Sequence, residues 1–168
     1  MALHYRFEHE FDCDPKTFWD FFFTEDYNAE VYQALRMVER KMLEFKDEGP
    51  TIRRSQRFKP AVSLPSVLQK VIPDSSYTER NVFHKDKSAM DVVIEPVAMA
   101  SKFDMRGTFT VTPAGEGRCK RVFEGDVKVS IMLVGGQVEK FMVEQMKTSY
   151  EIATKVTRDF IAKRKAKA

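Results

Sequence analysis

The sequence predicts an α+β fold in which a curved, seven-stranded antiparallel sheet wraps around one long C-terminal helix. Two observations lead to this prediction. Apolar and polar residues alternate at strand spacing over much of the chain up to about Val134, and turn residues separate most strands by short connections. Short connections favour antiparallel neighbours, because a parallel crossover needs about a dozen residues. The remaining residues change to helical spacing, with one apolar face that needs a whole sheet to cover it.

The length and composition fit one folded domain. The chain has 168 residues, of which 43% are hydrophobic and 32% are charged. This composition supplies a core. The sequence contains no run of about 18 apolar residues, the length needed to span a bilayer. We expect one domain over residues 1–168, with residues 162–168 as a frayed basic tail. The N-terminus reaches charged residues too early for a signal peptide, so a cytoplasmic location is expected.

Charge and cysteine content narrow the classes of partner. The net charge of +3 comes largely from four basic residues in the tail, which either contact anionic lipid or form a solvated helix end. Basic residues elsewhere alternate with acidic ones, so nucleic-acid binding is not expected. Cys13 and Cys119 have no further Cys or His nearby at metal-ligand spacing. Two reduced, packed thiols and no metal or cofactor are therefore expected.

The first elements are a strand and two short helices. Strand alternation places Leu3, Tyr5, Phe7, His9 and Phe11 on one dry face. Asp14 and Pro15 follow as an N-cap acceptor and a residue suited to the first helical position. This helix continues to about Phe23, and Thr24 can start a second helix over residues 25–35.

Six more strands and a long connection follow. The strands are expected at Met37–Phe45, Thr51–Phe58, Tyr77–Phe83, Met90–Ile94, Phe103–Val111 and Cys119–Leu133. The connection from Lys59 to Ser76 is longer than a hairpin loop and carries apolar residues bounded by prolines. It is expected to contain a short amphipathic helix that acts as a lid. Gly135-Gly136 ends the last strand, and helical periodicity then continues to Lys163, about 40 Å at ~1.5 Å per residue.

This order of elements resembles the START-like superfamily, which has the helix-grip fold of lipid-transfer domains, pollen-allergen-type ligand carriers and polyketide cyclases. The segments that carry the resemblance are Phe11–Trp19, Gly107–Pro113 and Gly135-Gly136. The chain is most similar to an uncharacterised bacterial branch whose members are inferred to bind lipids. The resemblance implies a hydrophobic ligand held between the sheet and the last helix, without a cofactor.

The candidate ligand-binding residues follow from strand alternation. The inward-facing strand residues would meet Met142 and Met146 on the last helix and Leu68 on the lid. Gly107 and Gly125 lie between the large strand residues and mark a bend or a close approach. The inward candidates on the strands are Met90, Val92, Ile94, Phe103, Met105, Phe109, Phe123 and Val127. Either these residues leave a cavity or they pack as a filled core.

Polar side chains on two earlier strands are the more informative candidates. An inward register of their apolar residues would also turn Glu39, Arg54 and Gln56 inward. A buried charge must be paired or must meet a polar group of a ligand. Arg54 would then pair with Glu39 or contact a ligand headgroup or hydroxyl. The alternative is that this edge of the sheet faces water.

The favoured function is binding, and transport or sensing, of a lipid or sterol-like molecule, with transient membrane-surface contact through the lid and the basic tail. No nucleophile elbow, phosphate loop or zinc helix is present, and His4, His9 and His84 are scattered. A non-catalytic domain is therefore favoured over a cyclase or aromatase-type enzyme, which would use Arg54, Glu39 and Tyr77 in the same cavity. The third alternative is a co-chaperone-like interaction domain.

Overall fold

The structure, a computed structural model, describes residues 2–61 and 63–168. Within these residues, seven strands form one antiparallel sheet in the order β1-β7-β6-β5-β4-β3-β2. The strands are β1 (Leu3–Phe11), β2 (Met37–Asp47), β3 (Thr51–Pro60), β4 (Tyr77–His84), β5 (Ala89–Pro96), β6 (Phe103–Pro113) and β7 (Cys119–Val129). The first and second strands of the chain are therefore the two edges of the sheet.

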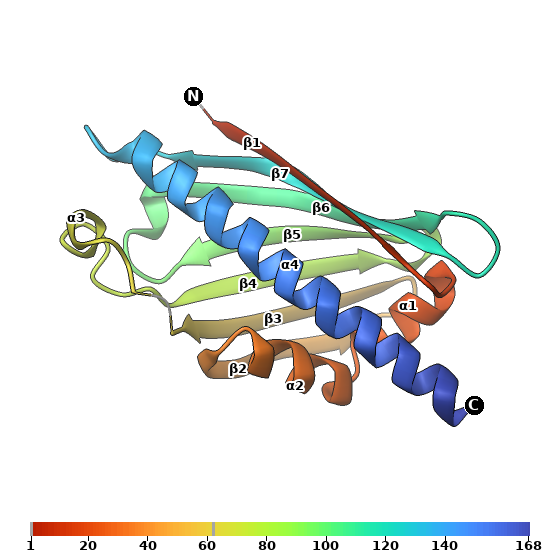
Figure 1. Ribbon diagram of the computed structural model, residues 1–168. Coiled ribbons are helices and arrows are strands. Elements are labelled where there is room, and N and C mark those ends of the chain that lie inside the picture. Colours follow the sequence, from red (N-terminus) through yellow and green to blue (C-terminus); the bar gives the residue numbers. More distant parts are fainter. Residues whose placement is uncertain (1, 62) are drawn as a thin grey trace.

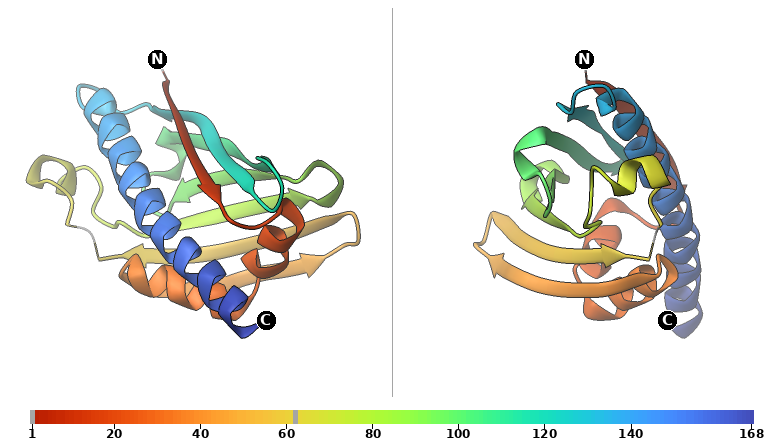
Figure 2. Two further views of the ribbon diagram at one scale, coloured as in Figure 1. Left: turned by 45° about the vertical axis from the view of Figure 1, so that its right-hand side comes forward. Right: turned by 90° about the vertical axis from the view of Figure 1, so that its left-hand side faces the viewer.

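Helices cover the concave side of this sheet. The long helix α4 (Gly135–Lys167) lies across it, and the sheet curves around one side of the helix (Figures 1 and 2). The helices α1 (Pro15–Phe22) and α2 (Glu25–Ala34) lie near the C-terminal half of α4, and the short helix α3 (Ser66–Gln69) lies at the opposite end (Figure 1). We call these the α1 end and the α3 end. The predicted α+β fold is confirmed.

The helix start predicted at Asp14 is present and closes the α1 end. Asp14 Oδ1 accepts a hydrogen bond from the Thr17 backbone N–H at 2.7 Å, and Pro15 occupies the first turn. This satisfies one of the free N–H groups of the helix. The buried rings of Phe18 and Phe21 then pack into the core. Phe21 contacts Phe160 of α4 with ring centroids 5.1 Å apart, which joins α1 to the long helix.

Two glycines allow strands β6 and β7 to approach Tyr5 closely. Gly107 and Gly125 are paired across the strands, and the Tyr5 hydroxyl lies above them and donates to the Arg106 carbonyl at 3.3 Å. A Cβ atom on Gly125 would lie 2.1 Å from that carbonyl oxygen. The close approach expected from the sequence is therefore confirmed.

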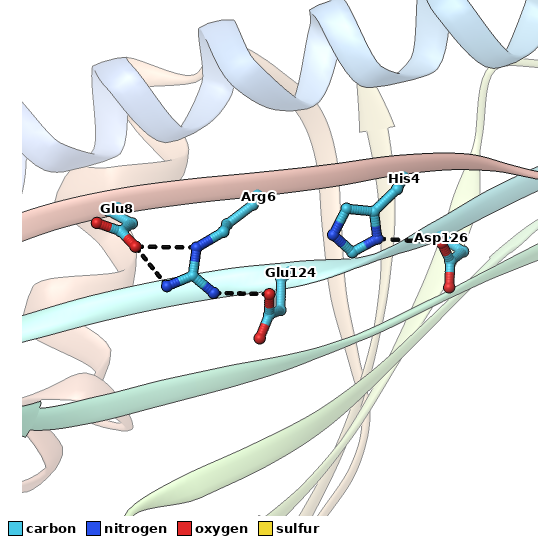
Figure 3. Close-up of polar contacts among 5 residues, drawn as sticks. All are labelled: His4, Arg6, Glu8, Glu124 and Asp126. Carbon is cyan, nitrogen blue, oxygen red and sulfur yellow. Dashed lines mark hydrogen bonds and ion pairs between the residues drawn. The ribbon is translucent and has the colours of Figure 1, made fainter.

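The outer face of β1 and β7 is polar, as the alternation predicted. Arg6 donates to Glu8 and to Glu124 of β7, and His4 lies 3.1 Å from Asp126 (Figure 3). These groups are exposed, so their pairing adds little to the free energy of unfolding. Because side chains alternate along a strand, the opposite, apolar face of both strands points toward α4.

The end of β7 differs from the prediction. The strand stops at Val129, and Leu133 is 95% exposed with a φ of 71° instead of continuing an inward face. The Gly135 N–H donates to the Ile131 carbonyl at 2.9 Å, so the chain turns before α4 begins. At the other end, α4 continues to Lys167.

The lid also differs in form. Among the described residues of the connection between β3 and β4, the four-residue helix α3 is the one helix, and most of the others are irregular. Leu68 and Ile72 are nevertheless buried, while Val67 is exposed. The segment thus covers apolar residues as expected, but not as a regular amphipathic helix.

The strand pair β2–β3 follows a different register from the one expected. Register shifts fall between Met37 and Glu39 and between Met42 and Glu44. An irregularity of this kind changes which side chains share a face. Glu39 is consequently exposed and makes no pair with Arg54, and Arg40 lies opposite Phe58 in its place. The inward position of β3 is retained, because Arg54 and Gln56 are buried.

Candidate functional site

A cavity of about 230 Å³ lies between the sheet and α4. Residues of α1, α2, the lid connection, α4 and every strand except β1 line it, and most of them are apolar or aromatic. Small-molecule sites in proteins typically measure about 300–1,000 Å³ and have apolar walls with few polar groups. This cavity is somewhat smaller than that range and has the same composition of wall.

Nine of the residues selected from the sequence line this cavity. They come from β3, β4, β5, β6, β7 and α4, so elements distant in the sequence meet at one site. These residues are Arg54, Tyr77, Met90, Ile94, Met105, Phe109, Phe123, Met142 and Met146.

The remaining six selected residues lie elsewhere. Val92 and Val127 are buried in the core, and Phe103 is half-buried. Leu68 is buried under the lid, whereas Leu64 and Ile72 of the same connection line the cavity. Gln56 is buried and accepts a hydrogen bond from Arg40 Nε at 3.1 Å, and Glu39 is exposed.

Arg54 is a buried cation held by neutral groups. Its Nε donates to Asn81 Oδ1 at 3.0 Å, and Nη1 donates to Asn28 Oδ1 at 3.3 Å. The guanidinium lies about 5 Å from the centroids of the Phe22 and Phe23 rings, where cation–π attraction is favourable. Only 2% of the residue is exposed.

Arg121 is a second buried cation and was not selected from the sequence. Its Nη2 donates to Thr154 Oγ1 at 2.6 Å and to His9 Nδ1 at 2.9 Å. Burial lowers the pKa of this guanidinium. Strand alternation was the available signal, because Arg121 shares a face of β7 with Phe123 and Val127, which were both selected.

Glu79 and three phenols are the other notable polar groups of the wall. Tyr32, Tyr77, Tyr150 and Glu79 all line the cavity. Burial raises the pKa of each of the three tyrosines, and the negative charge of Glu79 raises it further. The phenols are therefore hydrogen-bond donors at neutral pH. Glu79 lies two residues after Tyr77 on β4, so alternation was again the signal.

No group of three or more His, Cys, Asp or Glu residues in the described part of the chain could hold a metal ion. Cys13 and Cys119 are buried free thiols, as predicted. Among the residues that the structure describes, no helix is both long and apolar enough to cross a bilayer.

Comparison with known proteins gives a family and a set of similar folds. The family described as "Protein of unknown function (DUF2505)" matches residues 6–161. No curated protein matches the chain. The Zhui aromatase/cyclase from Streptomyces sp. R1128 has a TM-score of 0.68 at 11% identity, with 98% of this chain and 96% of that chain covered.

Two further solved structures have the same fold. A START superfamily protein from Mycobacterium smegmatis has a TM-score of 0.57 at 14% identity, with 97% of this chain and 99% of that chain covered. Norcoclaurine synthase from Thalictrum flavum, in complex with dopamine and hydroxybenzaldehyde, has a TM-score of 0.61 at 13% identity, with 94% and 87% covered. These similarities confirm the helix-grip fold and the resemblance to the START-like superfamily. At such identities they show the fold alone.

Proposed function

The chain belongs to the DUF2505 family, and from that premise we propose that it binds a hydrophobic small molecule, lipid or sterol-like, in the cavity between the sheet and α4. The cavity carries this proposal. The wall of this partly open cavity is mostly apolar, so a ligand that fills the cavity gains free energy from the apolar area that it removes from water. Transport or sensing of that molecule is the role proposed.

The walls support an apolar ligand of variable shape. Met90, Met105, Met142 and Met146 line the cavity from three elements. Methionine is unbranched and polarisable, so it adapts to irregular apolar surfaces. Among proteins of this fold, norcoclaurine synthase holds dopamine and hydroxybenzaldehyde, which are small aromatic molecules.

Transient membrane-surface contact is proposed for the α3 end. Exposed apolar residues lie in three connections there: Val67 in α3, Val97 and Met99 between β5 and β6, and Met132 and Leu133 before α4. These connections lie at the same end of the sheet (Figure 1). The basic residues of the tail lie at the opposite end of α4, so one flat membrane would not meet both. A cytoplasmic location and a single domain over residues 1–168 belong to the same proposal.

The test is recovery and displacement of a bound apolar molecule. Protein purified from cells is extracted with organic solvent and examined by mass spectrometry, and the emptied protein is titrated with a fluorescent fatty-acid probe and a fluorescent sterol. Micromolar binding of either probe is expected. The Met146→Trp variant fills the cavity and should weaken binding at least tenfold. Ile152→Trp is the matched control, because Ile152 is an exposed residue of the same helix.

Absence of binding by both probes, together with no extracted molecule, would contradict the proposal. Equal binding by Met146→Trp and wild-type protein would place the probe outside the cavity.

A cyclase or aromatase-type enzyme is the second candidate, and Glu79 favours it. A carboxylate and three buried phenols in one apolar cavity are groups that can move protons on a bound polyketide-like molecule. The test is to incubate the protein with the molecules that it is found to bind and to search for dehydrated or cyclised products by mass spectrometry. Product formation that Glu79→Gln abolishes while ligand binding is retained would establish the enzyme. An interaction domain would have an exposed apolar patch and no cavity, so the cavity disfavours that third alternative.

A further inference from the structure

Arg121 is a buried positive charge without a negative partner. The residue is 2% exposed and lines the cavity, and its guanidinium lies over the rings of Phe11 and Tyr150 at about 5 Å from their centroids. Its hydrogen-bond partners, Thr154 and His9, are neutral, because the pKa of His9 is lowered to about 4 by burial and by the neighbouring arginines Arg121 and Arg158. It forms no ion pair with any described residue.

The hydrogen bonds of this guanidinium are also incomplete. Both hydrogen bonds to described residues come from Nη2, and Nε is buried without a partner among those residues. Polar groups buried in proteins nearly always have partners, and each exception needs an explanation. A ligand in the cavity that accepts from this guanidinium would supply the negative charge that the described residues lack.

The other arginine of the cavity is different, because it is linked to a carboxylate. Asn81 accepts from Arg54 Nε through Oδ1 and donates to Glu79 Oε1 through Nδ2, each at 3.0 Å. This relay connects the charge of Arg54 to the opposite charge of Glu79 inside the same cavity. Arg121 has no such connection, so it is the uncompensated charge at the α1 end.

We propose that the ligand is an amphipathic molecule with one carboxylate, and that Arg121 receives this group at the α1 end of the cavity. This inference rests on the proposed function and names the chemical class of its ligand. A guanidinium matches a carboxylate in charge and planar geometry, and the low dielectric of the cavity strengthens the pairing. The apolar part of the ligand extends toward the α3 end, where Leu64 and Ile72 of the lid connection line the wall.

The experiment compares three probes of equal chain length: decanoate, 1-decanol and decylammonium. Each is titrated into wild-type protein by calorimetry or by displacement of a fluorescent probe. Decanoate should bind roughly tenfold or more tightly than 1-decanol, because hydrogen bonds to a charged group are among the strong ones, and decylammonium should bind most weakly. This comparison needs no variant.

Two variants then locate the group responsible. Arg121→Met places an apolar side chain in the wall instead of the charged one. This variant should lose the preference for decanoate and should still bind 1-decanol. Arg158→Met is the matched control, because Arg158 lies beside the same Phe11 ring, donates to the Glu10 carbonyl and does not line this cavity. It should keep the wild-type preference.

The outcomes separate the two proposals. If 1-decanol binds as tightly as decanoate to wild-type protein, or if folded Arg121→Met keeps the preference, the carboxylate inference is wrong and the hydrophobic site stands. Tightest binding of decylammonium would likewise overturn it. If none of the three probes binds, this inference is wrong, whereas the proposed function fails only if the solvent extraction and the fluorescent fatty-acid and sterol titrations also find no ligand.

Discussion

The charge state of His9 is set by its place in the core. Burial, followed by the positive charges of Arg121 and Arg158, lowers the pKa of His9 from 6.5 to about 4. His9 Nδ1 accepts a hydrogen bond from Arg121 at 2.9 Å, which requires an unprotonated nitrogen. The folded protein therefore disfavours protonation of His9 relative to the unfolded chain.

This pKa shift predicts a pH dependence of stability. Its stabilising contribution is fully present above about pH 6.5, where His9 is neutral in both states. The contribution is lost as the pH falls to about 4, because the unfolded chain binds the proton first. Urea denaturation at a series of pH values should show that His9→Asn makes the free energy of unfolding less dependent on pH in this window. His4→Asn, on the exposed face of the same strand, is the matched control. A constant difference between wild-type protein and His9→Asn across the window would contradict the prediction.

Gly125 is a second single position with a large expected effect. A Cβ atom there would lie 2.1 Å from the Arg106 carbonyl oxygen and 2.5 Å from the Gly107 Cα, so the backbone of β6 or β7 would have to move. Gly125→Ala should lower the free energy of unfolding by about 1–3 kcal/mol, the usual range for overpacking. Gly136→Ala is the control, because no atom lies within 4 Å of a Cβ at that helical position. Chemical denaturation measures both. Equal stability of the two variants would show that the strands can separate without cost.

Sequence patterns predicted most elements because their periods are direct consequences of backbone geometry. The alternation of β1 and the helical spacing of α4 each extend over many residues, so single exceptions did not obscure them. The register shifts of β2 could not be predicted, because nothing in the residues around Met42 distinguishes a shifted strand from a regular one. Glu39 is exposed, like most residues of the edge strand β2, whereas Arg54 on β3 is buried.

The connections at the α3 end give a prediction at the scale of elements. Met132 and Leu133 are 87% and 95% exposed in the turn between β7 and α4, and this turn lies at the same end of the sheet as α3 (Figure 1). Apolar side chains in such loops are expected to insert at a membrane surface. The double variant Met132→Ser with Leu133→Ser should therefore reduce co-sedimentation with anionic phosphatidylglycerol vesicles. Replacing Lys163, Lys165 and Lys167 by Ser at the opposite end should have a smaller effect. The reverse order would assign membrane contact to the basic tail.

At the scale of the whole molecule, the cavity is the feature that sequence patterns could not establish. Strand alternation identified seven of the nine selected wall residues, including Met105 and Phe123, but the same pattern also selected Val92 and Val127, which are packed in the core. Whether two apolar surfaces meet or leave a void depends on the curvature of the sheet and the distance to α4. These are properties of the assembled fold, and small differences in side-chain volume decide them.

A void kept for a ligand predicts opposite effects on stability and binding. Ala153 of α4 lines the cavity and has the smallest side chain of its helix there. Ala153→Leu places apolar atoms into the void, so it should raise the free energy of unfolding of the empty protein by about 1–2 kcal/mol. The same atoms should weaken binding of a fatty-acid probe, because they occupy its space. Ile152→Leu, at the adjacent exposed position, should change neither quantity appreciably. Denaturation and probe titration on the three proteins measure both effects. A variant Ala153→Leu that is more stable and binds the probe as well as wild-type protein would show that the ligand does not occupy this part of the cavity.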